Sequence, residues 1–93
     1  MDQARINRIR FRAWRRGFRE ADLILGPFAD TYAPGMSEAE LDELERLMDE
    51  PDQDLYAWII GREPAPDAFD TPMMRRIQAF RFEALGHRPD LGA

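Results

Sequence analysis

The sequence predicts an all-α protein, a small single-domain bundle of five helices. Apolar residues recur every three or four positions, which is the period of an amphipathic helix. Valine is missing, and no run alternates β-branched with polar residues as a half-buried strand would. Proline and glycine divide the 93 residues into helix-length segments, and a chain of this length forms one domain at most. We expect an ordered core over about 4–86 and a loose tail over 87–93.

The first helix is expected over 3–14. Apolar side chains at helical spacing form its predicted buried face: Ile6, Ile9, Phe11, Ala13 and Trp14. Gly17 then interrupts the pattern, because glycine is unfavourable inside a helix, and predicts a corner between two helices. The second helix resumes near Phe18. Pro27 is expected to end or kink it, and a turn is expected over 32–35.

The third helix has the clearest start. Ser37 and Glu40 match a capping box, and Met36 and Leu41 stand where a hydrophobic staple would place them. The predicted buried stripe contains Leu41, Leu44, Leu47 and Met48. Pro51 should stop this helix.

Two further helices follow. Asp52 is expected to cap the fourth, which Gly61 ends. Its apolar residues are Leu55, Tyr56, Trp58, Ile59 and Ile60. After a linker containing Pro64 and Pro66, Asp70 or Thr71 should cap the last helix, with Pro72 in its first position. Gly86 closes this helix, whose predicted apolar face consists of Met73, Met74, Ile77, Phe80 and Leu85.

Composition excludes most enzyme classes. The chain has no cysteine, so thiolate metal sites and cysteine nucleophiles are excluded. The single histidine, His87, is expected in a solvated tail, which argues against a histidine metal site or a Ser-His-Asp triad. We therefore expect no catalytic residues and no metal. No run approaches the roughly 20 apolar residues of a membrane span, and no secretory signal opens the chain.

Charge is distributed unevenly, although the net charge is only -5. Residues 1–20 hold seven arginines and two acidic residues, whereas residues 21–70 hold two arginines and fourteen acidic residues. The basic N-terminal stretch is therefore either a docking surface for an acidic partner or a partner for the acidic middle of the same chain. The acidic total argues against nucleic-acid binding, which stays open as the weakest alternative.

Three stretches carry a family resemblance: 15–22, Gly26-Pro27-Phe28 and 47–59. The first contains an R-G-x-x-E pattern, and the third combines an acidic patch and a proline with D-x-x-L-Y-x-W-I. Their order and spacing resemble the succinate dehydrogenase assembly factor 2 family, also called the FAD assembly factor SdhE. The resemblance covers roughly residues 4–85. Gly26 departs from it, because an apolar residue is expected before Pro27.

The resemblance implies a chaperone-like assembly factor of five helices. Such a factor binds the flavoprotein subunit of succinate dehydrogenase, and often that of fumarate reductase, and promotes covalent attachment of FAD to a histidine of that subunit. FAD is then the client's cofactor, and none is expected to bind this chain stably. The resemblance also implies a partner-binding surface formed by Arg15, Arg16, Gly17, Phe18, Arg19, Glu20 and Asp22. The protein is expected to be cytoplasmic and of bacterial type, with no transit peptide and no membrane or nucleic-acid partner.

Plainer interpretations accompany these hypotheses. Arg16 and Glu20 stand four positions apart, so they could form only a surface pair on one helix. Trp58 and Tyr56 are more typical of a core than of an interface. The acidic residues Asp49, Glu50, Asp52 and Asp54 lack the glycine and the terminal glutamate of a calcium loop, which favours capping and solvation. As a function, a regulatory module of the toxin-neutralising type is the main alternative.

Overall fold

The computed structural model describes residues 3–81, and they fold as five α-helices with two short 3₁₀ turns. The elements are α1 (Gln3–Trp14), α2 (Arg19–Tyr32), η1 (Ala33–Gly35), α3 (Glu38–Met48), α4 (Asp52–Ile59), η2 (Asp67–Phe69) and α5 (Pro72–Arg81). No strand occurs in this part of the chain. The all-α, five-helix prediction is therefore confirmed. The expectations for Leu85, Gly86, His87 and the tail over 87–93 lie outside the described residues.

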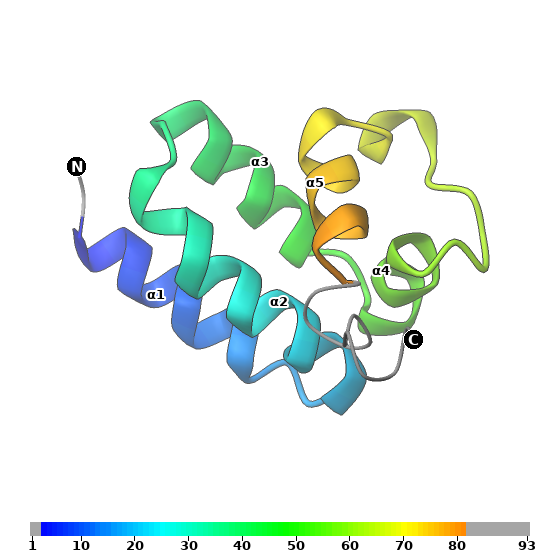
Figure 1. Ribbon diagram of the computed structural model, residues 1–93, viewed down its shortest axis with the longest axis horizontal. Helices are drawn as coiled ribbons and strands as arrows, with labels where there is room; N and C mark the ends of the chain where they lie inside the picture. Colours follow the sequence, from blue (N-terminus) through cyan, green and yellow to red (C-terminus); the bar gives the residue numbers. More distant parts are fainter. Residues whose placement is uncertain (1–2, 82–93) are drawn as a thin grey trace, which may run out of the picture.

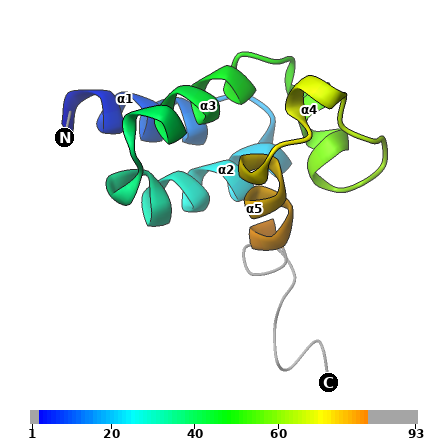
Figure 2. The same cartoon turned by 90° about the horizontal axis from the view of Figure 1, so that it is seen from above.

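The bundle has two ends. Figure 1 shows α1 and α2 side by side and antiparallel, with α4 and α5 gathered at the end where α3 finishes. Seen from above in Figure 2, α3 lies over the α1–α2 pair, and α4 and α5 lie beyond it. Helices α2 and α3 each contact α1, α4 and α5, so both of them join the two ends. The core lies between these helices and is wholly apolar in the described residues.

Local sequence signals explain two helix starts. Ser37 Oγ accepts a hydrogen bond from Glu40 N at 3.2 Å, and Ser37 N donates to Glu40 Oε1 at 2.9 Å, which completes the predicted capping box. The bond from the Ser37 backbone lowers the pKa of the Glu40 carboxyl. Thr71 Oγ1 accepts from Met74 N, so Thr71, of the two proposed residues, caps α5.

The predicted buried face of α1 is only partly correct. Ile6, Ile9 and Ala13 are fully buried, but Phe11 is 60% and Trp14 41% exposed. At 100° per residue, Phe11 lies roughly 140° around the helix from Ile6, so both cannot face the same core. Trp14 lies at the edge of the buried face. The prediction that these two rings belong to the core stripe is therefore wrong.

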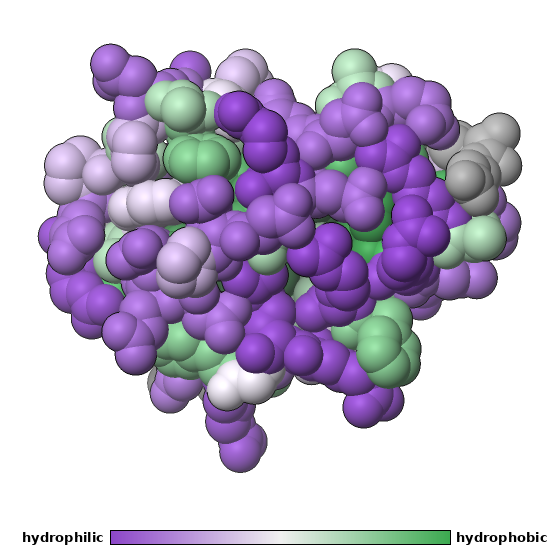
Figure 3. All heavy atoms as spheres, turned by 180° about the vertical axis from the view of Figure 1, so that it is seen from behind, coloured by the Kyte–Doolittle hydropathy of each residue, from purple (hydrophilic) through white to green (hydrophobic). Residues whose placement is uncertain are grey.

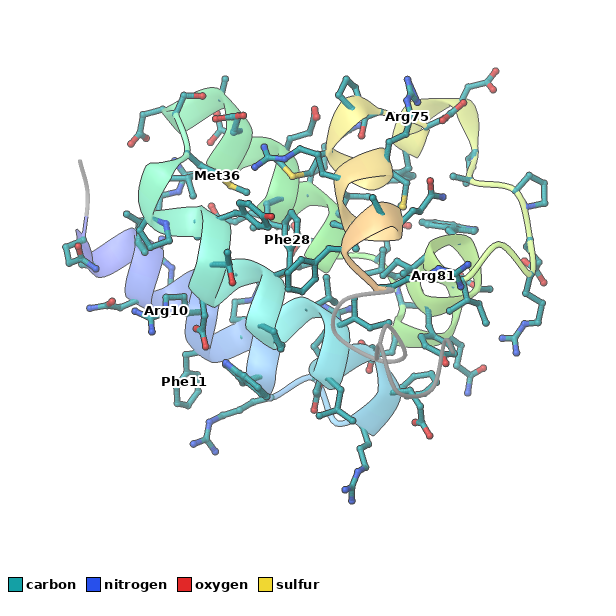
Figure 4. The ribbon with its side chains drawn as sticks, in the orientation of Figure 1. Arg10, Phe11, Phe28, Met36, Arg75 and Arg81 are labelled. Carbon is teal, nitrogen blue, oxygen red and sulfur yellow. The ribbon has the colours of Figure 1, made fainter. Side chains whose placement is uncertain are left out.

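Helix α2 passes through Pro27 and continues to Tyr32, so the expectation that the proline ends the helix is wrong, while a kink at this position stays a prediction. Proline removes one hydrogen bond of the helix, and tertiary packing compensates. Phe28, the next residue, is fully buried and points into the space between the helices (Figure 4). Gly26 is explained by the same packing, because the Trp14 indole lies directly against its Cα. An apolar side chain before Pro27 would occupy the space of that ring.

Two expectations about later elements also need correction. Asp52 does not cap α4: Pro51 is the N-cap residue, and Asp52 is the first residue of the helix. The linker before α5 contains the turn η2, which was not predicted. Gly61 ends α4 as expected, with a φ of 79° that favours glycine. Trp58 is buried and stacks on Phe69, which confirms its predicted place in the core.

Gly26→Ala should destabilise the protein by about 1–3 kcal/mol, because overpacking displaces neighbouring groups. A Cβ at this position would lie 2.3 Å from Cδ2 of Trp14. Gly35→Ala is the matched control, since a Cβ there meets nothing within 4 Å and φ is not positive. It should be neutral or stabilising by up to about 1 kcal/mol. Urea unfolding of both variants measures the difference, and equal stabilities would contradict the packing of Trp14 on Gly26.

Candidate docking surface

The corner between α1 and α2 is built by two residues of the predicted surface. Gly17 has a φ of 88°, a conformation that glycine adopts without the cost that a Cβ imposes. The Asp22 carboxylate accepts a hydrogen bond from Arg16 N at 3.1 Å, across the corner. Asp22 therefore shapes the loop from within α2. Phe18 is half-buried, and its ring lies 5.0 Å from that of Tyr56 in α4.

Arg16 joins this corner to the loop between α3 and α4. Its guanidinium donates to Met48 O at 2.6 Å and to Glu50 O at 2.8 Å, and its Nε lies 2.6 Å from Asp52 Oδ1. The side chain is only 8% exposed. The two carbonyls lie at the C-terminal end of α3 and just beyond it, where backbone acceptors lack helical partners. Arg16 therefore satisfies the end of α3 and ties together the first and third sequence stretches.

Other residues of the predicted surface face solvent. Arg15, Gly17, Arg19 and Glu20 are exposed. Because Arg16 precedes α2 and pairs with Asp52, the alternative of an Arg16–Glu20 pair on one helix is wrong. The structure thus divides the predicted surface between supporting residues (Arg16, Phe18 and Asp22) and accessible ones. Its role in binding stays a prediction.

A shallow groove runs between the corner and the start of α4. We call it the corner groove, and it is lined by Gly17, Phe18, Arg19, Glu20, Pro51, Asp52, Gln53 and Asp54. The predicted surface omits four residues of the groove, although they belong to the third motif stretch: Pro51, Asp52, Gln53 and Asp54. The bridge made by Arg16 and the contact between the Phe18 and Tyr56 rings bring that stretch beside the R-G-x-x-E segment.

Most N-terminal arginines pair within the chain. Arg5 contacts three carboxylates of α3: Glu38 at 2.8 Å, Glu45 at 2.7 Å and Asp42. The hydrogen bonds that Arg5 donates to Asp42 and Glu45 raise the pKa of Arg5. Further ion pairs join Arg12 to Asp49 and Arg10 to Asp30, both at 2.8 Å. The intramolecular interpretation of the basic stretch is therefore correct for these arginines and for Arg16. Within residues 3–81, Arg8, Arg15 and Arg19 form no ion pair.

Asp49, Glu50, Asp52 and Asp54 lie between the end of α3 and the first turn of α4, in a segment that we call the acidic loop, and two of them form ion pairs. Asp49 contacts Arg12 and Asp52 contacts Arg16. No group of three or more His, Cys, Asp or Glu residues in the described part of the chain could hold a metal ion. The corner groove offers backbone at Gly17, a carboxylate at Glu20 and a guanidinium at Arg19. This arrangement is suited to recognising a partner protein by hydrogen bonds and charge.

The fold and the groove define a class of protein, a small all-α domain with a shallow surface groove, whose N-terminal arginines largely pair with its own carboxylates. The chain belongs to the family described as "Flavinator of succinate dehydrogenase", which it matches over residues 7–81. It is 40% identical to the FAD assembly factor SdhE of Acetobacter pasteurianus, over 80% of this chain and 68% of that protein.

Mitochondrial relatives are longer. The chain is 40% identical to the mitochondrial succinate dehydrogenase assembly factor 2 of Scheffersomyces stipitis and 47% identical to that of Debaryomyces hansenii, and it spans about half of each protein. The resemblance inferred from the three motif stretches is thereby confirmed. Among the described helices, none has both the length and the apolar character needed to cross a membrane.

Arg16→Ala should lower the free energy of unfolding by about 2–4 kcal/mol, because it removes charged hydrogen bonds and leaves Asp52 without its partner. Arg19→Ala is the control, since this arginine is exposed and surface truncations usually change stability by no more than about 0.5 kcal/mol. Chemical denaturation followed by far-UV circular dichroism measures both. An Arg16→Ala protein as stable as Arg19→Ala would show that the bridge contributes little.

Proposed function

We propose that this chain is an assembly factor that binds the flavoprotein subunit of succinate dehydrogenase and promotes its covalent flavinylation with FAD. The observation that carries the proposal is the exposure of Gly17, Arg19 and Glu20 on the corner groove of a chain that belongs to the flavinator family. The rigid bridge below the groove supports it, because a preorganised surface loses less conformational entropy when a partner binds.

The proposed mechanism leaves the chemistry to the client. Covalent flavinylation needs proton loss from the flavin 8-methyl group and attack by a histidine held in near-attack geometry. We propose that the flavoprotein supplies these groups and that FAD is its cofactor, with none held stably by this chain. The assembly factor then acts by binding the reactive conformation of the client more tightly than the others, which shifts the client toward it. It is a binding protein and not an enzyme.

The same docking mode would serve the flavoprotein of fumarate reductase, and a cytoplasmic site of action fits both clients. A nucleic-acid role has less support, because Arg5, Arg10, Arg12 and Arg16 are already paired with carboxylates. Phosphate groups would have to displace those carboxylates, and the net charge of -5 would repel them. No contact in the described residues favours a toxin-neutralising module.

Glu20→Ala tests the docking surface. Truncation of a central interface residue commonly costs about 2 kcal/mol, near thirtyfold in affinity, so binding and covalent FAD yield should both fall. The melting temperature should stay close to that of the wild type, because Glu20 is exposed. Glu63→Ala, another exposed carboxylate in the loop after α4, is the matched control.

The measurement is in-gel flavin fluorescence of the succinate dehydrogenase flavoprotein in cells that lack this gene and carry each variant. Normal flavinylation with a folded Glu20→Ala protein would remove Glu20 from the docking surface. A large drop in its melting temperature would assign Glu20 a structural role instead.

A further inference from the structure

The outer face of α1 carries a second surface, which we call the aromatic surface. It is a shallow groove between α1 and α2 lined by Asn7, Arg10, Phe11, Trp14, Arg15 and Asp30. Phe11 is 60% exposed, and Figure 4 shows it pointing away from the bundle. Phe11 and Trp14 are two of the three large apolar side chains exposed in the described chain. On the rear face shown in Figure 3, hydrophobic residues form patches among hydrophilic ones.

Trp14 is held rigidly in this groove. One face of its indole lies against Gly26, and its Nε1 donates to Asp30 Oδ2 at 3.0 Å. The other oxygen of Asp30 accepts from Arg10 at 2.8 Å, so the ring is fixed from two sides. A fixed, half-exposed indole gives a partner aromatic surface at little entropic cost.

Phe11 has no comparable structural role. The Arg15 guanidinium lies 4.5 Å from the centre of its ring, in cation–π contact. Arg15 has no carboxylate partner within residues 3–81, because the acidic residues nearby are paired with other arginines. The contact leaves the charge of Arg15 available and places it beside an exposed apolar ring. This combination is complementary to a carboxylate that stands next to an apolar side chain.

The aromatic surface is continuous with the corner groove. A further shallow depression, lined by Phe11, Arg12, Arg15, Arg16 and Asp52, connects the two. Phe11 and Arg15 belong also to the aromatic surface, and Asp52 belongs also to the corner groove. A partner that covers the corner groove can therefore extend along α1 without crossing a gap.

We propose that the aromatic surface binds an acidic segment of the flavoprotein, with an apolar side chain of that segment against Phe11 and Trp14 and a carboxylate on Arg15. This inference rests on the proposed function and extends its interface. Charge argues against a second copy of this chain that places the same surface over this one: a two-fold axis through the aromatic surface would bring one Arg15 toward the other, and like charges at an interface cost affinity.

The experiment measures the affinity of the full chain for the purified succinate dehydrogenase flavoprotein by isothermal titration calorimetry. Phe11→Ala and Arg15→Glu should each weaken binding about tenfold or more, as expected for central aromatic and arginine residues of an interface. Phe11→Tyr keeps the ring and should bind within about twofold of wild type. Arg62→Glu is the charge control, because this exposed arginine lies in the loop after α4 and its reversal alters the net charge equally. The loss caused by Arg15→Glu should shrink as salt rises, since exposed charges are screened.

The outcomes separate this inference from the proposed function. If the wild type binds the flavoprotein and both Phe11→Ala and Arg15→Glu bind it with the same affinity, the inference is overturned and the proposed function stays intact. Equal losses in Arg15→Glu and Arg62→Glu would also overturn it, because they would show a general charge effect. Absence of wild-type binding would overturn both. Loss of self-association in Phe11→Ala, seen by analytical ultracentrifugation while client affinity stays normal, would assign the surface to a second copy instead.

Discussion

One arginine ties the corner between α1 and α2 to the loop between α3 and α4. Arg16 leaves the end of α1, donates to the carbonyls of Met48 and Glu50, and pairs with Asp52 at the start of α4. Without these contacts the carbonyls of Met48 and Glu50 would lose their donor. The α1–α2 corner and the start of α4, which line the corner groove, would then have no direct polar link. The relation between the R-G-x-x-E segment and the acidic loop is thus set by a mostly buried guanidinium.

The residues of this segment consequently have different tasks. Arg16 and Asp22 are used inside the fold, one at the end of α3 and the other across the corner. Gly17 provides the left-handed turn between them. Arg19 and Glu20 face solvent and are the residues that a partner can reach. Loss of activity after a change at Arg16 would therefore reflect lost structure as much as lost contact.

Sequence reasoning succeeded where local chemistry decides the outcome and failed where distant contacts decide it. Ser37 and Glu40 form their capping box within four residues, so the start of α3 was predictable. Pro27 was expected to end or kink α2, but it does not end the helix, because burial of Phe28 and the fit of Trp14 against Gly26 outweigh one lost hydrogen bond. Likewise, nothing local to Asp52 indicates Arg16, 36 positions earlier, as its partner. The residues of the predicted surface came from the family resemblance, and they did not include Pro51, Asp52, Gln53 and Asp54, which form the other side of the corner groove.

The most direct test of this account is a double-mutant cycle between Arg16→Ala and Asp52→Ala, with free energies of unfolding measured in urea. The single variants and the double variant together isolate the energy of the pair. The account predicts a coupling of about 1–3 kcal/mol, because the guanidinium is mostly buried and partnered on three sides. Additive losses, with a coupling near zero, would contradict the claim that this bridge holds the docking surface together.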